Sequence, residues 1–506
     1  MAVVARPGDP TGQPRRPDAS AGRDATRWLL GAIIALGVLV RFTTLNEQSF
    51  WYDESATWAI VAHGLAHVFS TVPQTESTPP LYYVLLWLWS RVFGTGEVGL
   101  RSFSALCSTL TIPVMWMIGR RLLSERAGLI AALLTAVNPF LFWYAQEARV
   151  YSLLLLLSAI TVLTLVHVLE APSRGRVLLW GLSAGLALAA HYYAAVLIAS
   201  EAAWLGWSLY RRRRLTVERA MLGLAPSIIV GAALIPLLVE QNNGRANYIA
   251  TQEGSLPHRV AQLAKEDIIG QGQPAKVLLT VLGCGLVAIA LWLLVRRSRR
   301  SERAAGVMLA TVGVGGVLVA VVVAAVGTDY FDTRNLIATW PALGLLVAGG
   351  LGAARARRIA GWVTAGLVVL SLICVWNIIA NPAYQRPNWR DAARALGPAD
   401  GPRAIVSDVN SRTELGPYLS DLHVFPVAGG RVREIDIVWL QRATQWGPIA
   451  PIAPMPLAGF PSVTVTRTST YVIVRYRAAT PQLTSRASLD RIYPIPVSEA
   501  ALLQDG

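Results

Sequence analysis

The sequence predicts an α-helical, polytopic membrane protein with a small α/β domain at its C-terminal end. Hydrophobic residues make up 54% of the 506 residues, charged residues make up only 15%, and long uncharged segments recur along the chain. A soluble domain carries about 25% charged residues, so this chain has too little charge to cover a surface that faces water. Segments such as Val314–Val326, which contains no charged residue, are typical of transmembrane helices.

Eleven apolar segments approach the length of about 20 residues that a spanning helix needs. They are Trp28–Leu45, Ser102–Ile118, Ala127–Trp143, Tyr151–Leu169, Val177–Ala190, Ala194–Leu209, Ala220–Val239, Lys276–Val295, Ala304–Val326, Leu336–Ala353 and Ile359–Ile379. The division between the fifth and the sixth segment rests on three residues alone. Residues 1–26 are rich in Pro, Gly, Arg and Ala, and we expect them to form a disordered cytoplasmic tail.

The basic residues fix the orientation of these segments. The net charge is 45 − 30 = +15, and the arginines fall in short clusters between apolar segments rather than on a face that would bind nucleic acid. The clusters lie in the tail and at residues 120–126, 174–176, 211–214, 296–300 and 355–358. Eleven spans place every cluster on the inner side. We therefore expect a plasma-membrane protein with a cytoplasmic N-terminus and an extracytoplasmic C-terminal domain.

One further apolar segment, Leu81–Phe93, is only about half as long as a span and is rich in Trp and Tyr. Counting it as a span would move the cluster at residues 120–126 to the outer side. It is therefore predicted to be an interfacial helix on the outer leaflet, where amphipathic aromatic residues concentrate. The stretch Ser55–Phe69 is a candidate for a second such helix.

The C-terminal part of the chain is polar and rich in proline. Ser462–Thr468 and Thr470–Val474 alternate like strands, and Arg403–Asp408 followed by a helix-like stretch to Leu419 predicts a strand and then a helix. The chain is thus divided into a tail (1–26), a transmembrane module (27–380) and an extracytoplasmic α/β domain (381–506).

Two loops on the predicted outer face carry candidate catalytic residues. Asp53 and Glu54 follow the first span, and paired carboxylates at a membrane surface are costly unless they face water, bind a metal or act as acid or base. Glu147 and Arg149 lie between two spans with almost no linker, so neighbouring groups must satisfy their charges. The alternatives are a turn whose acids face water and an ion pair at a helix end.

Four motifs in this order resemble the GT-C superfamily of glycosyltransferases, in the branch of protein O-mannosyltransferases and aminoarabinose transferases. They are Trp51-Tyr-Asp-Glu54, Ser77-Thr-Pro-Pro-Leu-Tyr-Tyr83, Gln146-Glu-Ala-Arg149 and Phe331-Asp-Thr-Arg334. Such enzymes transfer a sugar from a polyprenyl phosphate in the outer leaflet, invert its anomeric centre and need no nucleotide-binding domain. The resemblance therefore implies a GT-C fold and an inverting, polyprenyl-phosphate-dependent glycosyltransferase. Mannose or a pentose is the implied sugar, and a cell-wall glycan, a lipid or a protein hydroxyl is the implied acceptor.

The resemblance also assigns roles to individual residues. Asp53 corresponds to the first-loop acid, which acts as general base or orients the acceptor hydroxyl, and Glu54 supports it. Arg334 corresponds to the arginine that holds the donor phosphate, although Asn335 follows it where many relatives have Tyr. Asp329 and Asp332 lie close in sequence and would compete for Arg334, and a helix-end pair with Asp332 is the structural alternative.

Other residues are assigned to the same cavity with less specific roles. Arg149 is expected near the phosphate or sugar, Glu147 as a second acid or the ion-pair partner of Arg149, and Tyr151 against the sugar. The residues expected to line the site or contact the acceptor are Glu76, His191 and Tyr192. For Glu76 the alternative is an acid exposed on the loop, and for Tyr151 and His191 it is an ordinary residue at the membrane boundary.

The sequence assigns no metal ligands. His63 and His67 are spaced to share a helix face, but no nearby acid makes a third ligand. A divalent metal therefore stays open without a defined site. Two other functions remain as alternatives: a transporter or flippase of lipid-linked sugars, although the chain lacks the internal repeats of transporters, and a membrane scaffold without catalysis.

Overall fold

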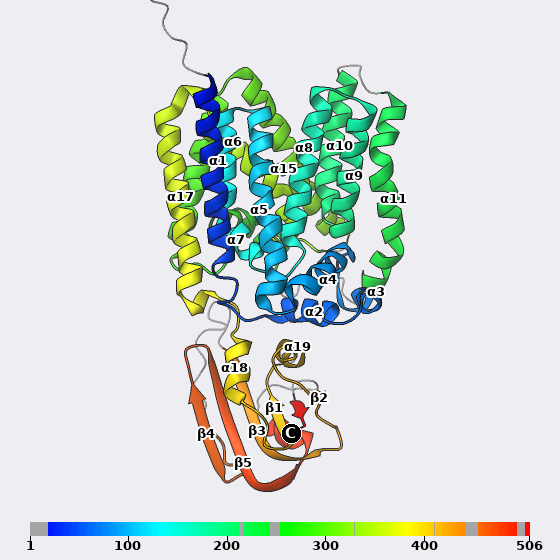
Figure 1. Ribbon diagram of the computed structural model, residues 1–506, viewed down its shortest axis with the longest axis vertical. Coiled ribbons are helices and arrows are strands. Elements are labelled where there is room, and N and C mark those ends of the chain that lie inside the picture. The colour runs from blue at the N-terminus through cyan, green and yellow to red at the C-terminus, as the bar shows by residue number, and fades with distance from the viewer. Residues whose placement is uncertain are drawn as a thin grey trace, which may run out of the picture.

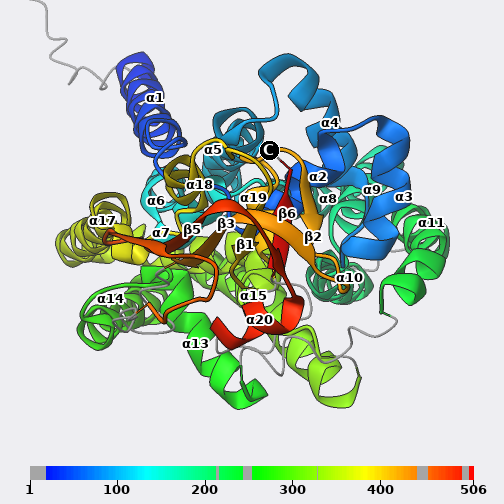
Figure 2. The ribbon, with the colours of Figure 1, turned by 90° about the horizontal axis from the view of Figure 1, so that it is seen from below.

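The computed structural model describes residues 19–211, 216–242, 254–327, 329–408, 410–440, 454–492 and 501–505. Helices form an elongated bundle, and an α/β domain lies at one end of it (Figure 1). The first residues of α1 (Ala19–Phe42) lie at the opposite end of the bundle from this domain. Seen from below, the domain covers the centre of the bundle, and α1, α11 and α17 lie at its periphery (Figure 2).

The described part of the bundle has a helix at each of the predicted spans. These helices are α1, α5 (Glu97–Leu122), α6 (Glu125–Val137) with α7 (Pro139–Ala145), α8 (Tyr151–Glu170), α9 (Arg174–Ala190), α10 (Ala194–Arg211), α11 (Val217–Asn242), α14 (Lys276–Arg297), α15 (Arg300–Val326), α16 (Trp340–Leu351) and α17 (Arg357–Ala380). Within the described residues, seven helices are long and apolar enough to cross a membrane, or eight if the bent pair α6 and α7 is one span. The chain is thus a multi-pass membrane protein, but the predicted number of eleven spans is not confirmed.

Local sequence explains why several predicted spans are short or broken. The predicted span Ala127–Trp143 bends by 55° between α6 and α7. At this bend the side chain of Asn138 accepts a hydrogen bond from the Leu141 amide, and Pro139 begins the new helix. Proline is favoured at the first position of a helix because it has no amide hydrogen to satisfy there. The predicted span Leu336–Ala353 is also not one continuous α-helix, because a 3₁₀ turn, η1 (Asn335–Thr339), precedes α16.

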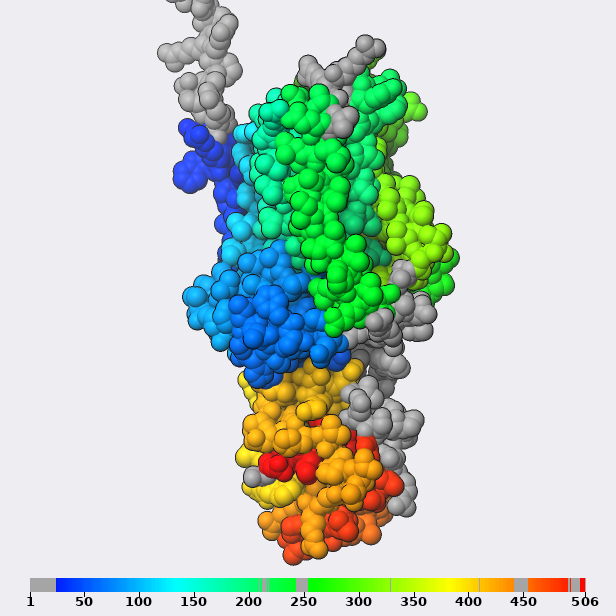
Figure 3. All heavy atoms as spheres, turned by 90° about the vertical axis from the view of Figure 1, so that its right-hand side faces the viewer, coloured from blue at the N-terminus to red at the C-terminus, as the bar shows by residue number. Residues whose placement is uncertain are grey.

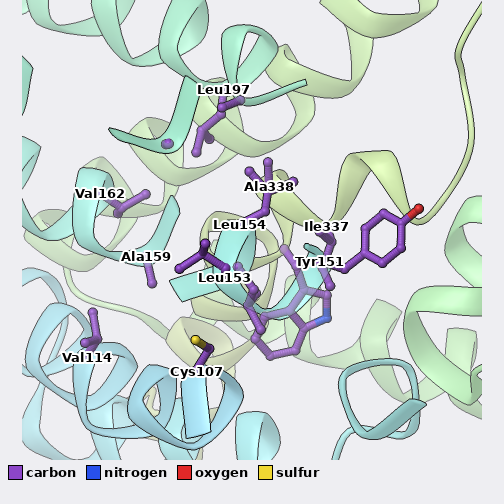
Figure 4. Close-up of a cluster of buried hydrophobic side chains, with 14 of the residues drawn as sticks. Cys107, Val114, Tyr151, Leu153, Leu154, Ala159, Val162, Leu197, Ile337 and Ala338 are labelled. Carbon is purple, nitrogen blue, oxygen red and sulfur yellow. The ribbon is translucent and has the colours of Figure 1, made fainter. Parts of the chain in front are cut away.

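The bundle core lies between α5, α8, α10 and η1, where buried apolar side chains contact one another (Figure 4). Leu154, Val162 and Leu197 are fully or almost fully buried in this cluster. Small residues bring neighbouring helices close, as is common in membrane proteins. Gly119 of α5 and Gly128 of α6 meet in this way. A Cβ atom on Gly119 would lie only 2.7 Å from the Cα atom of Gly128, which is too close for a side chain.

Four shorter helices lie at the end of the bundle that faces the α/β domain (Figures 1 and 2). They are α2 (Tyr52–Val61), α3 (Leu65–Thr75), α4 (Leu81–Phe93) and α13 (Leu256–Ile269). The helix predicted over Leu81–Phe93 is confirmed as α4, and its place at the membrane interface stays a prediction. The predicted stretch Ser55–Phe69 is divided between α2 and α3.

The C-terminal part begins with η3 (Pro382–Tyr384) and α18 (Trp389–Leu396) and contains a six-stranded sheet with the order β2-β6-β1-β3-β5-β4. Its strands are β1 (Arg403–Val406), β2 (Leu422–Val424), β3 (Gly430–Leu440), β4 (Ser462–Arg467), β5 (Tyr471–Thr484) and β6 (Ala501–Gln504). Only the β1–β3 pair is parallel among the described strand pairs. The predicted α/β domain is confirmed, with α19 (Ser411–Leu415) after β1 and α20 (Arg486–Ile492) after β5, whereas β2, β3 and β6 were not predicted.

The segment after α1 lies at the end of the bundle next to the C-terminal domain (Figures 1 and 3). The Phe50 amide donates a hydrogen bond of 2.7 Å to the Tyr418 hydroxyl, which donates to Glu97 at 2.9 Å. The Ser49 hydroxyl donates to the Pro387 carbonyl at 2.7 Å and accepts from the Trp389 amide at 3.0 Å. The loop that carries the first motif therefore contacts the C-terminal domain directly.

Candidate active site

All four sequence motifs lie at the same end of the bundle, next to the C-terminal domain. The first motif begins α2, the second leads into α4, the third joins α7 to α8, and the fourth precedes η1. Because antiparallel helices return the chain to the same face after every second pass, segments far apart in sequence meet there. Asp53 and Arg334, which are 281 positions apart, are in direct contact.

Asp53 and Arg334 form the most accessible charged pair of the site. The Arg334 Nη1 atom lies 3.2 Å from Asp53 Oδ2, and its Nε atom lies 3.0 Å from Asp332 Oδ2. The Asp53 and Arg334 side chains are 19% and 22% exposed. The predicted competition of Asp332 for Arg334 is thus present, but Asp53 shares the same guanidinium.

Glu54, the neighbour of Asp53, is fully buried and turned toward α5. Arg101 donates to both of its carboxylate oxygens, at 2.7 and 2.6 Å, and the Ala148 amide donates at 2.9 Å. Burial raises the pKa of Glu54, but the Arg101 guanidinium outweighs this effect and the pKa lies below its usual value. Glu54 is an ionised structural carboxylate that joins the first loop to α5 and to the third motif.

Arg149 pairs with Glu76 rather than with Glu147. Its two terminal nitrogens lie 2.8 and 2.9 Å from the two Glu76 oxygens, and Nη1 also donates to the Tyr83 hydroxyl at 3.2 Å. Glu76 is buried, so the alternative of an exposed loop acid is wrong. The reason is that Arg149 would otherwise be a buried charge without a counter-ion, which is costly.

Glu147 pairs with an arginine from the start of the C-terminal part, which was not expected. The Arg386 Nη2 atom lies 2.9 Å from Glu147 Oε2, and Glu147 is buried. Burial raises the pKa of Glu147 to about 7; Arg386 opposes this shift, whereas Glu54 and Asp53 reinforce it. Glu147 is therefore not the ion-pair partner of Arg149, because Arg386 compensates its charge instead.

Of the other residues expected in the site, Tyr151 and His191 lie beside the charged groups and Tyr192 does not. Tyr151 and His191 are buried with ring centroids 6.2 Å apart, and burial lowers the pKa of His191 to about 3, so the imidazole is neutral. Tyr192 instead donates its hydroxyl hydrogen bond to Gln241 Oε1 at 2.9 Å, which fastens the end of α11. Tyr192 thus connects helices rather than facing Asp53 and Arg334.

Arg259 of α13 holds the loop that carries Arg334. It forms a two-pronged ion pair with Asp329, including a 2.9 Å bond from Nη1, and donates to the Phe331 carbonyl. Asp329 is consequently engaged by Arg259 and does not compete for Arg334.

The described residues contain no group of three or more His, Cys, Asp or Glu side chains that could hold a metal ion. His63 and His67 are stacked edge to face with centroids 4.8 Å apart.

Several buried polar atoms of the site have no hydrogen-bond partner among the described residues. They are Glu147 Oε1, Arg149 Nε, Tyr193 Oη and Arg386 Nε. Buried polar groups are normally paired, so these atoms are suited to form hydrogen bonds with a bound polar molecule. A carboxylate and an arginine that are both partly exposed can bind an anion and accept a proton there.

Comparisons with known proteins agree with this architecture. Residues 77–237 match the protein family described as dolichyl-phosphate-mannose-protein mannosyltransferase. This match includes the second and third motifs and ends in α11. No curated protein matches the chain.

Among solved structures, the chain is similar to ArnT from Cupriavidus metallidurans bound to undecaprenyl phosphate, with a TM-score of 0.55 and 15% identity over 89% of this chain and 98% of ArnT. The apo state of the same protein gives a TM-score of 0.54 at the same 15% identity and coverage of 89% and 98%. The archaeal oligosaccharyltransferase AglB from Archaeoglobus fulgidus is more distant, with a TM-score of 0.44 and 12% identity over 74% of this chain and 58% of AglB. The chain has the GT-C fold of membrane glycosyltransferases, and the predicted resemblance to this superfamily is confirmed.

Proposed function

We propose that this protein is an inverting glycosyltransferase that moves a sugar from a polyprenyl-phosphate donor to an extracytoplasmic hydroxyl acceptor. Mannose or a pentose is the proposed sugar, and the acceptor is a cell-wall glycan, a lipid or a protein hydroxyl. The site faces the outer side of the plasma membrane, with the N-terminus in the cytoplasm. The contact between Asp53 and Arg334, both partly exposed among buried ion pairs, is the observation that carries this proposal.

The two side chains supply the two functions that such a transfer needs. A sugar or serine hydroxyl is a weak nucleophile, and a carboxylate within hydrogen-bond reach accepts its proton as it attacks. The departing polyprenyl phosphate gains negative charge, which a guanidinium stabilises through two parallel hydrogen bonds. Asp53 is the proposed general base, and Arg334 is the proposed phosphate-binding group.

The ion pairs of Arg334 in the absence of donor indicate how donor binding and proton transfer are linked. Asp53 and Asp332 both neutralise Arg334. A donor phosphate competes with Asp53 for the guanidinium, while Asp332 keeps Arg334 in position. Donor binding thereby releases Asp53 toward the acceptor hydroxyl, so that the base becomes available only when a sugar is bound.

The other charged groups play supporting roles in this proposal. Both terminal nitrogens of Arg149 are engaged by Glu76, which leaves its buried Nε for a phosphate or sugar oxygen. Tyr151 lies beside the neutral His191, where its ring is suited to contact the sugar. Glu147 is a third carboxylate near Arg334, after Asp53 and Asp332, and is the proposed second acid of the site.

The comparisons support the substrate classes of this proposal. The similar ArnT structure holds undecaprenyl phosphate, which is a polyprenyl phosphate, and the matched family is described by dolichyl-phosphate-mannose. Both names point to a lipid phosphate as the carrier, and the second to mannose as the sugar.

The proposal is tested with purified protein in lipid nanodiscs. Wild-type protein is incubated with a panel of polyprenyl-phosphate sugars and candidate hydroxyl acceptors, and donor cleavage is followed by mass spectrometry. Asp53→Asn keeps the shape of the side chain and removes its basicity. It should lower transfer by about 100- to 10,000-fold, which is the usual contribution of a general base.

Asp332→Asn is the matched comparison, because it removes the other carboxylate from Arg334. We expect it to lower transfer less than Asp53→Asn does, because it leaves the proposed base in place. Equal losses in both variants would show that Asp53 merely holds Arg334, and wild-type transfer by Asp53→Asn would remove it from the mechanism. If the wild type cleaves no donor with any acceptor of the panel, the enzymatic proposal fails.

A further inference from the structure

We propose that Arg386, carried by the segment that joins α17 to the C-terminal domain, is a positioning residue for the active site. It holds the first-loop segment (residues 48–54) and the third-motif segment (residues 146–149) together, so that the C-terminal domain sets the geometry in which Asp53 works. The effect on catalysis rests on the proposed function, whereas the ordering of the two segments does not.

The Arg386 side chain is inserted between both segments. It is 2% exposed, and its guanidinium carbon lies 4.3 Å from the Trp143 ring centroid and 6.0 Å from that of Trp51. Its terminal nitrogens donate to Glu147 Oε2 at 2.9 Å and to the Gln146 and Trp143 carbonyls at 3.3 Å. One planar cation thus binds a carboxylate, two carbonyls and an indole ring, a combination that lysine cannot reproduce.

Charge balance makes Arg386 necessary at this position. Glu54 has its own counter-ion in Arg101, and its Oε2 lies 4.0 Å from Arg386 Nε. Glu147 is 1% exposed, and within the part of the chain that the structure describes it forms an ion pair with Arg386 alone. A buried carboxylate without a counter-ion is strongly destabilised, so loss of Arg386 would raise the pKa of Glu147 further above its usual value.

The charged and titratable groups around Glu147 come from several elements. They are Arg386 from the linker, Asp53 and Glu54 from α2, Arg334 from the loop before η1, Tyr144 from α7 and Tyr151 from α8. Of these groups, the two acids oppose ionisation of Glu147 and the two arginines favour it. Removal of Arg386 leaves Arg334 alone against both acids, and Arg334 is already shared by Asp53 and Asp332.

The linker also fixes the backbone of the first loop. The Arg386 amide donates to Gln48 Oε1 at 3.0 Å, and Ser49 contacts Pro387 and Trp389. Asp53 lies four residues after Ser49, at the N-terminal end of α2. A shift of the linker therefore moves the carboxylate relative to Arg334.

The experiment compares Arg386→Gln and Arg386→Lys with Arg394→Gln, a change of an exposed arginine on α18 that pairs with Asp391. Hydrogen exchange of the full-length protein in nanodiscs is measured by mass spectrometry for peptides covering residues 48–54 and 146–149. Arg386→Gln should raise exchange in both segments and leave α8 and the C-terminal sheet unchanged. Arg394→Gln should match the wild type throughout.

The kinetics of sugar transfer provide a second measurement. A residue that only stabilises the fold would not change both kcat and the pH profile. Misplacement of the reacting groups by Arg386→Gln should lower kcat by about 100-fold with little change in KM. Loss of the cation should also move the acidic limb of the pH profile to higher pH by about 1 to 3 units. Arg386→Lys should restore the pH profile and only part of kcat, because it retains the charge but not the planar contacts.

Wild-type exchange in both segments of Arg386→Gln would overturn the proposal. So would a variant that has a lower melting temperature but an unchanged kcat and pH profile, because Arg386 would then only stabilise the fold. If the wild type transfers no sugar, the enzymatic function fails, and the exchange data still decide whether Arg386 orders the two segments.

Discussion

At the scale of single residues, the two neighbouring acids of the first motif have different environments. Successive residues of a helix point about 100° apart, so Asp53 faces Arg334 while Glu54 faces Arg101. Asp53 remains partly exposed, and Glu54 is fully buried with both oxygens engaged. Only Asp53 is free to exchange its partner for a substrate, which is why the general-base role is assigned to it and not to Glu54.

Arg334→Ala should weaken binding of the donor phosphate, because each hydrogen bond between a charged donor and a phosphate is worth about 1.5–3 kcal/mol. The affinity for undecaprenyl phosphate should fall by at least about tenfold, and Arg334→Lys should lose less. The measurement is the rise in melting temperature that undecaprenyl phosphate produces in nanodiscs. Arg174→Ala, at an exposed position near the start of α9, serves as control, and undiminished protection of Arg334→Ala would exclude the assignment.

At the scale of elements, short loops are held in place by arginines from the neighbouring helices. Arg101 of α5 donates to the carbonyls of Leu45, Gln48 and Ser49 in addition to its ion pair with Glu54. Arg259 of α13 does the same for the loop before η1. The loops thus gain the rigidity that a catalytic constellation requires without belonging to the spanning helices.

Glu54→Gln should destabilise the protein, because breaking one side of a buried ion pair costs about 3–5 kcal/mol. Glu170→Gln is the matched control: Glu170 lies 3.0 Å from Arg121, both side chains are 39% exposed, and such surface pairs contribute at most about 1 kcal/mol. Melting temperature and the yield of folded protein are the measurements. A Glu54→Gln variant with wild-type stability and no transfer would assign Glu54 to catalysis after all.

At the scale of the whole molecule, the basic clusters and the candidate site occupy opposite ends of the bundle (Figure 1). Arg120 and Arg121 end α5, and Arg296 and Arg297 end α14. Asp53, Glu76 and Arg334 lie beside the C-terminal domain at the other end. This polarity agrees with a basic face in the cytoplasm and a site on the outer side.

The orientation predicts which positions an impermeant maleimide reaches in intact cells. Ser469→Cys, in the turn between β4 and β5 of the C-terminal domain, should be labelled without permeabilisation. Gly175→Cys, at a position where an added Cβ atom meets no neighbour, should be labelled only after permeabilisation. The native cysteines give the background, and the reverse pattern would contradict the proposed orientation.

Features that depend on local sequence were predicted well. The length and charge of apolar segments located the helices of the bundle, and the short apolar helix α4 matches its predicted bounds. The loops that carry the candidate site were also found, because motifs and topology place them on one face. The number of spans was not confirmed, since breaks such as Asn138-Pro139 depend on how the helix packs as well as on composition.

The sequence by itself thus determined the membrane class of the protein, its helices and the loops that carry the candidate residues. Tertiary structure decided which charges pair: Arg149 with Glu76, and Glu147 with Arg386, 239 positions away. The ion pairing of Arg101 could have been expected from the sequence, since an arginine at the start of an apolar span requires a partner. The sequence around Arg386 gives no comparable indication of its partner. Pairing depends on which side chains share a low-dielectric environment, and only the folded chain brings those side chains together.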